Sequence, residues 1–294
     1  MSEGGAEVEK GSTITVETVL QSIEKTEDWW GKLQELMGQG KPVTDFISGT
    51  IGVLNQLETL AQNPHLQLPQ SPEEAAKIKA LWIISAPGTY SQAYKQDRYA
   101  TKPWSRWMDR QRINYTLQVG RKLAEIKLGH PISSNWAETE RELTEQGPLI
   151  VYNGTPAENA AVLEAKKTPW LRIPEGNIYP GNKIVVISPI KGIDNTIDQI
   201  KSFHLPPAFD LSPGDEIGVI LHAPQAVRFL YELANFKDSI PQEANLRIFS
   251  LPTPKGGFPE YPMQELRGTT YYHFIANPPI AAESPYPFKS VSSK

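Results

Sequence analysis

The 294-residue chain contains no cysteine. This excludes disulfide bonds, thiolate nucleophiles and cysteine-ligated metal sites. Histidine is scarce as well, and the spacing of the five histidines matches no HExxH motif or other metal-binding pattern. A Walker-type phosphate loop is absent, and the first predicted strand is followed by one glycine rather than the three of a dinucleotide fingerprint. The sequence therefore predicts no metal site and no NAD site.

Long apolar runs and a strong charge bias are also missing. No apolar run approaches the roughly 20 residues of a membrane span, and the net charge of −4 comes without a basic stripe. These features argue against a membrane span and against nucleic acid as the main partner. Residues 1–11 lack the basic start and apolar stretch of a signal peptide. We therefore expect a cytoplasmic protein.

The clearest positive feature is a set of four short apolar runs, each followed by small or polar residues that begin a predicted helix. They lie at residues 81–88, 149–154, 183–189 and 216–224, and a fifth strand is predicted at 246–251. Short runs bounded by Gly or Pro are typical of strands buried on both faces. Their alternation with helices predicts an α/β fold, a doubly wound, mostly parallel, Rossmann-like sheet of about five strands.

The rest of the chain is organised around this sheet. We expect a disordered tail at residues 1–12, a helical N-terminal extension at 13–70, the Rossmann-like domain at 71–276 and an extended or disordered arm at 277–294. Within these regions, Asp28 is expected to cap a helix, and residues 170–173 and 270–275 are expected to form further strands. The extension is expected to pack on the sheet. In the alternative interpretation, its helices around Trp29 bind a protein partner.

Polar residues follow the predicted strands where ligands of parallel sheets bind. At the second strand, the N–H groups of Gly154 and Thr155 are expected to hold an anion at a helix N-terminus, beside Asn153. Glu158, one turn further, could accept a hydrogen bond from a ribose or an amine. The same residues also fit ordinary helix capping without a ligand.

The other strand ends supply further candidates. Gly88 follows the first strand, and Asn195 and Thr196 begin the helix after the third. Arg228, one turn into the helix after the fourth strand, could neutralise an anion. His222 can titrate near neutral pH, so His222 and Glu158 are the two weak catalytic candidates. No Ser-His-Asp triad can be assembled from these residues.

Three of these segments, in this order, resemble the YdcF-like α/β family, which includes the SanA and ElyC envelope proteins. The stretch Tyr152-Asn153-Gly154 with Glu158 is similar to the family's Ser-Gly-Gly turn followed by a Glu-Ala pair. Residues 194–199 resemble its Ser-x-Asn-Thr-x-x-Asn helix start, with Gln199 in place of the final Asn, and Arg228 matches the arginine of its last helix. The resemblance covers about residues 78–252. One family member is described as binding S-adenosylmethionine, so the resemblance implies that compound as a ligand.

Together, the residues and the resemblance predict a binding protein for a small polar ligand that is nucleotide-like or anionic, with S-adenosylmethionine as one candidate. One alternative is an enzyme that transfers methyl groups or hydrolyses phosphate or amide bonds. The other is a non-catalytic scaffold that binds a protein partner. The residues expected to line the ligand site are Gly88, Asn153, Gly154, Thr155, Glu158, Asn195, Thr196 and Arg228.

Overall fold

The structure, a computed structural model, describes residues 13–85, 107–167, 169–173, 176–187, 192–193, 195–236, 241, 244–253 and 260–276. The predicted tail at 1–12 and arm at 277–294, together with Gly88 and Asp194, lie outside these ranges.

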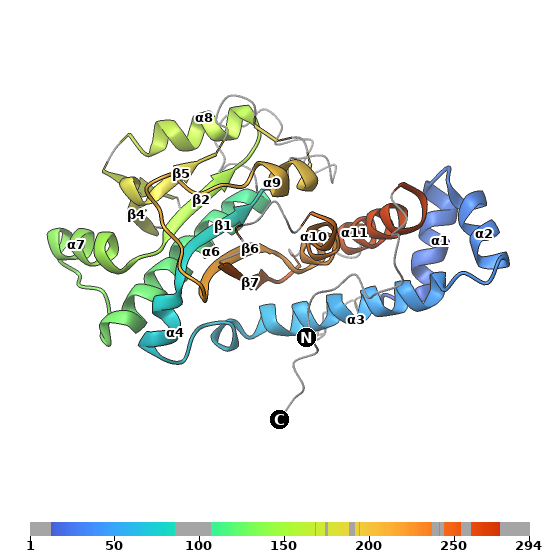
Figure 1. Ribbon diagram of the computed structural model, residues 1–294, viewed down its shortest axis with the longest axis horizontal. Helices are drawn as coiled ribbons and strands as arrows, with labels where there is room; N and C mark the ends of the chain where they lie inside the picture. The colour runs from blue at the N-terminus through green and yellow to red at the C-terminus, as the bar shows by residue number, and fades with distance from the viewer. Residues whose placement is uncertain are drawn as a thin grey trace, which may run out of the picture.

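A five-stranded parallel sheet forms the centre of the molecule (Figure 1). Its strands are arranged in the order β5 (Ile184–Val186), β2 (Leu149–Asn153), β1 (Ile78–Ile84), β6 (Asp215–His222) and β7 (Ala244–Leu251). Every neighbouring pair is parallel. The predicted doubly wound α/β fold is therefore confirmed, as is its strand number.

The strand order determines where a ligand crevice is expected. The chain begins in the middle with β1, adds β2 and β5 on one side, and then crosses to the other side for β6 and β7. The direction of winding thus reverses between β1 and β6. In open parallel sheets, ligands bind beside the carboxyl ends of the strands at such a reversal.

Helices cover both faces of the sheet. One face is covered by α6 (Trp107–Leu128), α7 (Trp136–Gln146) and α8 (Pro156–Ala165), and the other by α9 (Thr196–Ser202) and α10 (Ala223–Asn235). Both faces are apolar, which explains why the strands read as continuous hydrophobic runs rather than alternating ones.

The central strand β1 shows this packing directly. Its residues Trp82 and Ile84 belong to the core shared with α10, whereas Ile83 packs on the α6 side. Trp82 lies between Phe203 and Phe229, at ring-centroid distances of 4.2 and 5.6 Å. Because side chains alternate along a strand, the single run joins two hydrophobic cores.

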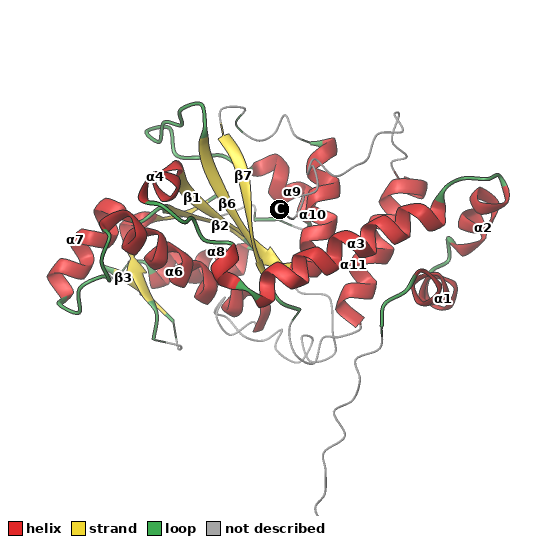
Figure 2. Cartoon of the chain, turned by 90° about the horizontal axis from the view of Figure 1, so that it is seen from below, coloured by secondary structure: helices red, strands yellow, loops and turns green. Residues whose placement is uncertain are grey.

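The N-terminal helices share the core on the α10 side. They are α1 (Val16–Thr26), α2 (Trp30–Gly38) and α3 (Val43–Gln62). Helix α3 contacts α10, β7 and the C-terminal helix α11 (Glu260–Tyr271), while α1 contacts α11. Figure 2 shows α3 running beside α11 toward α1 and α2. The extension is thus joined to the sheet through one continuous apolar core.

Smaller elements complete the described chain. They are η1 (Pro64–Leu66), α4 (Pro72–Lys77), β3 (Trp170–Arg172), β4 (Ile178–Pro180), η3 (Gly181–Lys183) and η5 (Tyr272–Ala276). The extra strand expected at 170–173 is confirmed, since β3 pairs with β4 in an antiparallel hairpin. Within the described ranges, no helix is both long and apolar enough to cross a bilayer.

Two local expectations are wrong. Residues 270–275, expected to be a strand, continue α11 and then form the π-helical turn η5. Their aromatic residues favour a strand, but packing decides otherwise, since the ring of His273 stacks on Phe46 at 4.0 Å. The second error concerns Asp28: the residue at the N-cap of α2 is Trp29, and no side chain caps this helix.

The buried Tyr179 provides a test of this packing. Its hydroxyl donates to Pro148 O at 2.9 Å, and its ring packs against the backbone of Gly147. A Cβ at Gly147 would lie 2.5 Å from Leu143 O and would also clash with the Tyr179 hydroxyl. We expect Gly147→Ala to lower the free energy of unfolding by about 1 to 3 kcal/mol, measured by urea denaturation.

Gly49→Ala is the matched control. Gly49 is an exposed glycine within α3, and an added Cβ there meets no atom within 4 Å. Helix propensity should raise the stability of this variant by up to about 1 kcal/mol. Equal urea midpoints for the two variants would contradict the packing described for Tyr179.

Candidate functional site

A cluster of buried polar side chains lies at the carboxyl ends of β1 and β6. Ser85 directly follows β1, Asp109 and Arg112 belong to the first two turns of α6, and Gln225 belongs to the first turn of α10. All four are at most 1% exposed. Three segments distant in sequence thus bring their polar groups to the point where the winding of the sheet reverses.

Hydrogen bonds close this cluster into a ring. Arg112 Nη1 lies 3.0 Å from Asp109 Oδ1 in an ion pair, and Ser85 Oγ donates to Asp109 Oδ2 at 2.9 Å. On the other side, Arg112 Nη2 donates to Gln225 Oε1 at 2.8 Å, and Gln225 Nε2 donates to Ser85 O at 3.2 Å. Two tyrosine hydroxyls contact this ion pair. The hydroxyl of Tyr152 lies 3.4 Å from Asp109 Oδ2, and the hydroxyl of Tyr261 lies 3.4 Å from Arg112 Nη2.

A second group of charges surrounds Arg228 on α10. Its Nε lies 3.1 Å from Glu265 Oε2 of α11 and 3.9 Å from Glu232 Oε1 of α10. Its Nη2 donates to Thr196 Oγ1 of α9 at 3.1 Å. Arg228 therefore links three helices beside the carboxyl edge of the sheet.

Glu265 interacts electrostatically with both groups. Burial raises the pKa of this carboxyl group, while the positive charges of Arg228 and Arg112 both oppose the rise. Five charges alternate in sign, and we call them the charge row: Asp109, Arg112, Glu265, Arg228 and Glu232. Four of them are buried, and the side chain of Arg228 is 14% exposed. With every group ionised, three carboxylates face two guanidinium groups, and the row carries one excess negative charge.

The carboxyl group of Glu232 has a raised pKa, chiefly because it is buried. Burial raises the pKa of its carboxyl group to about 7; the charge of Arg228 opposes this rise and the charge of Glu265 adds to it. Glu232 therefore changes its protonation state near neutral pH.

This pKa predicts how stability depends on pH. An unfolded glutamate has a pKa of about 4.3, so between that value and about 7 only the folded state retains the proton on Glu232. Folding then loses up to about 3 kcal/mol as the pH rises through this window. Glu232→Gln cannot ionise and should not show this loss. We therefore expect the free energy of unfolding of the variant, measured by urea denaturation, to increase relative to that of the unmodified protein when the pH is raised from about 5 to about 8.

The control is Glu164→Gln, at an exposed ion pair with Lys167 on the opposite face of the sheet. Its stability relative to the unmodified protein should be the same at both pH values. A stability difference for Glu232→Gln that does not change with pH would contradict the raised pKa.

The end of β2 differs from the predicted anion site. The N–H of Thr155 donates to Glu158 Oε2 at 2.8 Å, and the N–H of Gly154 donates to Asn159 Oδ1 at 2.8 Å. Thr155 and Glu158 form a capping box at the start of α8. Both backbone donors are thus engaged by the chain's own side chains, so the geometry supports the capping interpretation and not the anion-binding role.

The remaining predicted residues divide into two groups. Arg228 belongs to the charge row, and Thr196 accepts a hydrogen bond from it. Asn195 caps α9 by accepting from the N–H of Asp198 at 2.9 Å. The buried Asn153 donates to Ser202 Oγ at 2.8 Å and joins β2 to α9.

His222, a predicted catalytic candidate, is fully buried at the end of β6. Its Nδ1 lies 2.9 Å from Pro252 O, and its ring meets that of Tyr261 edge-on at 6.3 Å. These contacts tie β6 to the segment after β7. None of them places His222 against the hydroxyl of Ser85.

Most residues of the charge row are not among the candidates predicted from the sequence. Asp109 and Arg112 carry a detectable signal, because a three-residue spacing places them on one face of a helix. Ser85 follows an apolar run, as the recognised candidates do. Glu265 carries no such signal, since its helix was not expected.

Comparison with protein-family models, with curated proteins and with solved structures gave no match to this chain. Its class therefore rests on the geometry alone: a doubly wound α/β protein with buried polar groups at the reversal point of its sheet. Within the described ranges, no group of side chains is suited to hold a metal ion.

Proposed function

We propose that the protein binds a small polar ligand, carrying both a positive and a negative group, at the carboxyl ends of β1 and β6. The observation that supports this most is the position of the charge row. Buried ion pairs give no general stability advantage over apolar residues of the same volume. Here they lie where parallel sheets bind ligands.

The alternation of charge favours a zwitterionic ligand over a simple anion. Each guanidinium of the row lies beside a carboxylate, so the row offers both signs at short range. A ligand with an ammonium and a carboxylate group can exchange partners with such a row without leaving a buried charge unpaired. S-adenosylmethionine has this chemistry, and the resemblance to the YdcF-like family supports the same compound.

An enzymatic function has less support from the described residues. Ser85 is a candidate nucleophile by position, but its hydroxyl donates to Asp109, and the charge of that carboxylate is balanced by Arg112. A serine nucleophile needs a base that accepts its proton. Binding is therefore the function that the geometry supports best.

The test is a calorimetric titration of the protein with S-adenosylmethionine. Arg228→Lys keeps the charge but loses the planar fork that contacts Glu265 and Thr196. Thr196→Val keeps the volume and removes the hydroxyl that accepts from Arg228. We expect each variant to bind about tenfold more weakly, which is about 1.4 kcal/mol.

Arg247→Lys serves as the control, because Arg247 is paired with Glu216 near the amino end of β6, away from the charge row. This variant should bind like the unmodified protein. Absence of binding to the unmodified protein, or equal affinity in all variants, would contradict the proposal and favour a purely structural charge row.

A further inference from the structure

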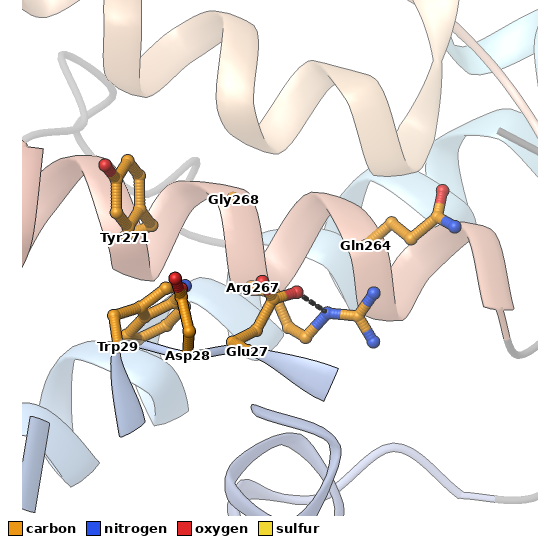
Figure 3. Close-up of a pocket in the computed structure, with 7 residues that line it drawn as sticks. All are labelled: Glu27, Asp28, Trp29, Gln264, Arg267, Gly268 and Tyr271. Atoms are coloured by element: carbon orange, nitrogen blue, oxygen red, sulfur yellow. Dashed lines mark ion pairs between the residues drawn. The ribbon is translucent and has the colours of Figure 1, made fainter. Parts of the chain in front are cut away.

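A pocket of about 460 Å³ opens between the turn that joins α1 to α2 and one face of α11 (Figure 3). The turn contributes Glu27, Asp28 and Trp29, and α11 contributes Arg267 and Tyr271. A volume of this size is typical of sites for small molecules or single side chains. None of the residues that line the pocket belongs to the charge row, so the pocket is a second, distinct candidate site.

The charges in its wall do not cancel. Arg267 Nε lies 3.0 Å from Glu27 Oε1, and Arg267 Nη1 donates to Ser22 Oγ at 2.6 Å. The positive charge of Arg267 is therefore balanced by Glu27. Asp28 is exposed and forms no ion pair with any residue of the described chain. One negative charge remains in the wall of the pocket.

Two aromatic rings stand beside this charge. The ring centroids of Trp29 and Tyr271 are 5.6 Å apart, and the ring planes are inclined at 53°. Figure 3 shows Tyr271 on α11 and, across from that helix, Trp29 and Asp28 in the turn. Tyr271 is 36% exposed and accessible to a ligand, whereas Trp29 is 8% exposed and contributes to the pocket wall. The face of an aromatic ring attracts a cation within about 6 Å.

We propose that this pocket binds an organic cation, namely a guanidinium or ammonium group on an apolar stem. Asp28 would pair with the cation, and the rings of Trp29 and Tyr271 would contact the cation and its stem. Asp28 alone has a simpler explanation, because an acidic residue beside the N-terminus of α2 is favourable. That explanation does not account for the pocket or for the exposed Tyr271.

The cation can come from a free small molecule or from the side chain of a partner protein. Two probes separate these sources: arginine with both ends blocked, and a short peptide with one central arginine. The same compounds with citrulline in place of arginine are the matched controls, because citrulline keeps the shape and lacks the charge. Binding is followed by two-dimensional NMR of the full chain and by the fluorescence of its tryptophans.

We expect both arginine probes to bind and both citrulline probes to bind at least about fivefold more weakly. A peptide that binds more tightly than blocked arginine identifies a partner protein as the source, whereas equal affinity identifies a free cation. No binding of either arginine probe, or equal binding of the citrulline probes, would overturn the proposal.

Variants locate the site. Asp28→Asn removes the charge at constant shape, and Tyr271→Leu removes the aromatic face; each should weaken binding by about fivefold or more. Tyr271→Phe keeps the face and should retain binding, which separates loss of the ring from loss of the fold. Asp45→Asn, on the exposed side of α3, should leave binding unchanged. Unchanged affinity in Asp28→Asn and Tyr271→Leu would show that the cation binds elsewhere.

Discussion

The buried ion pair between Asp109 and Arg112 is the interaction on which the centre of the molecule depends. Both side chains are fully removed from solvent, and an isolated charge in such a place would cost several kcal/mol. Ser85 donates a hydrogen bond to Asp109, and Gln225 accepts one from Arg112. The electrostatic requirement of one ion pair therefore fixes α6 and α10 relative to the end of β1.

The same requirement extends to the outer helices. Glu265 on α11 lies 3.1 Å from Arg228 and is also influenced by the charge of Arg112, and the hydroxyl of Tyr261 on the same helix lies 3.4 Å from Arg112 Nη2. Helix α11 packs against α10, α3 and α1. The N-terminal helices thus support a helix that completes the charge row, although none of them contributes a residue to it. This arrangement makes the extension a structural part of the candidate site.

The sequence predicts the sheet well because strands buried on both faces must be apolar, as the run at β1 illustrates. Capping is also local, so Asn195 and the pair of Thr155 and Glu158 could be recognised. The sequence pattern at Thr155 is compatible with an anion site and with a capping box. Only the hydrogen bonds between Thr155 and Glu158 distinguish the two. The helical fold of residues 270–275 and the charge row were missed because both depend on contacts between segments far apart in the chain.

We propose that the charge row is a binding site and not only a structural network. The most direct test is hydrogen–deuterium exchange of the unmodified protein with and without S-adenosylmethionine, resolved along the chain. We expect added protection at the ends of β1 and β6 and in the first turns of α6 and α10, where these side chains converge. Unchanged exchange throughout the protein, or protection confined to other segments, would contradict it.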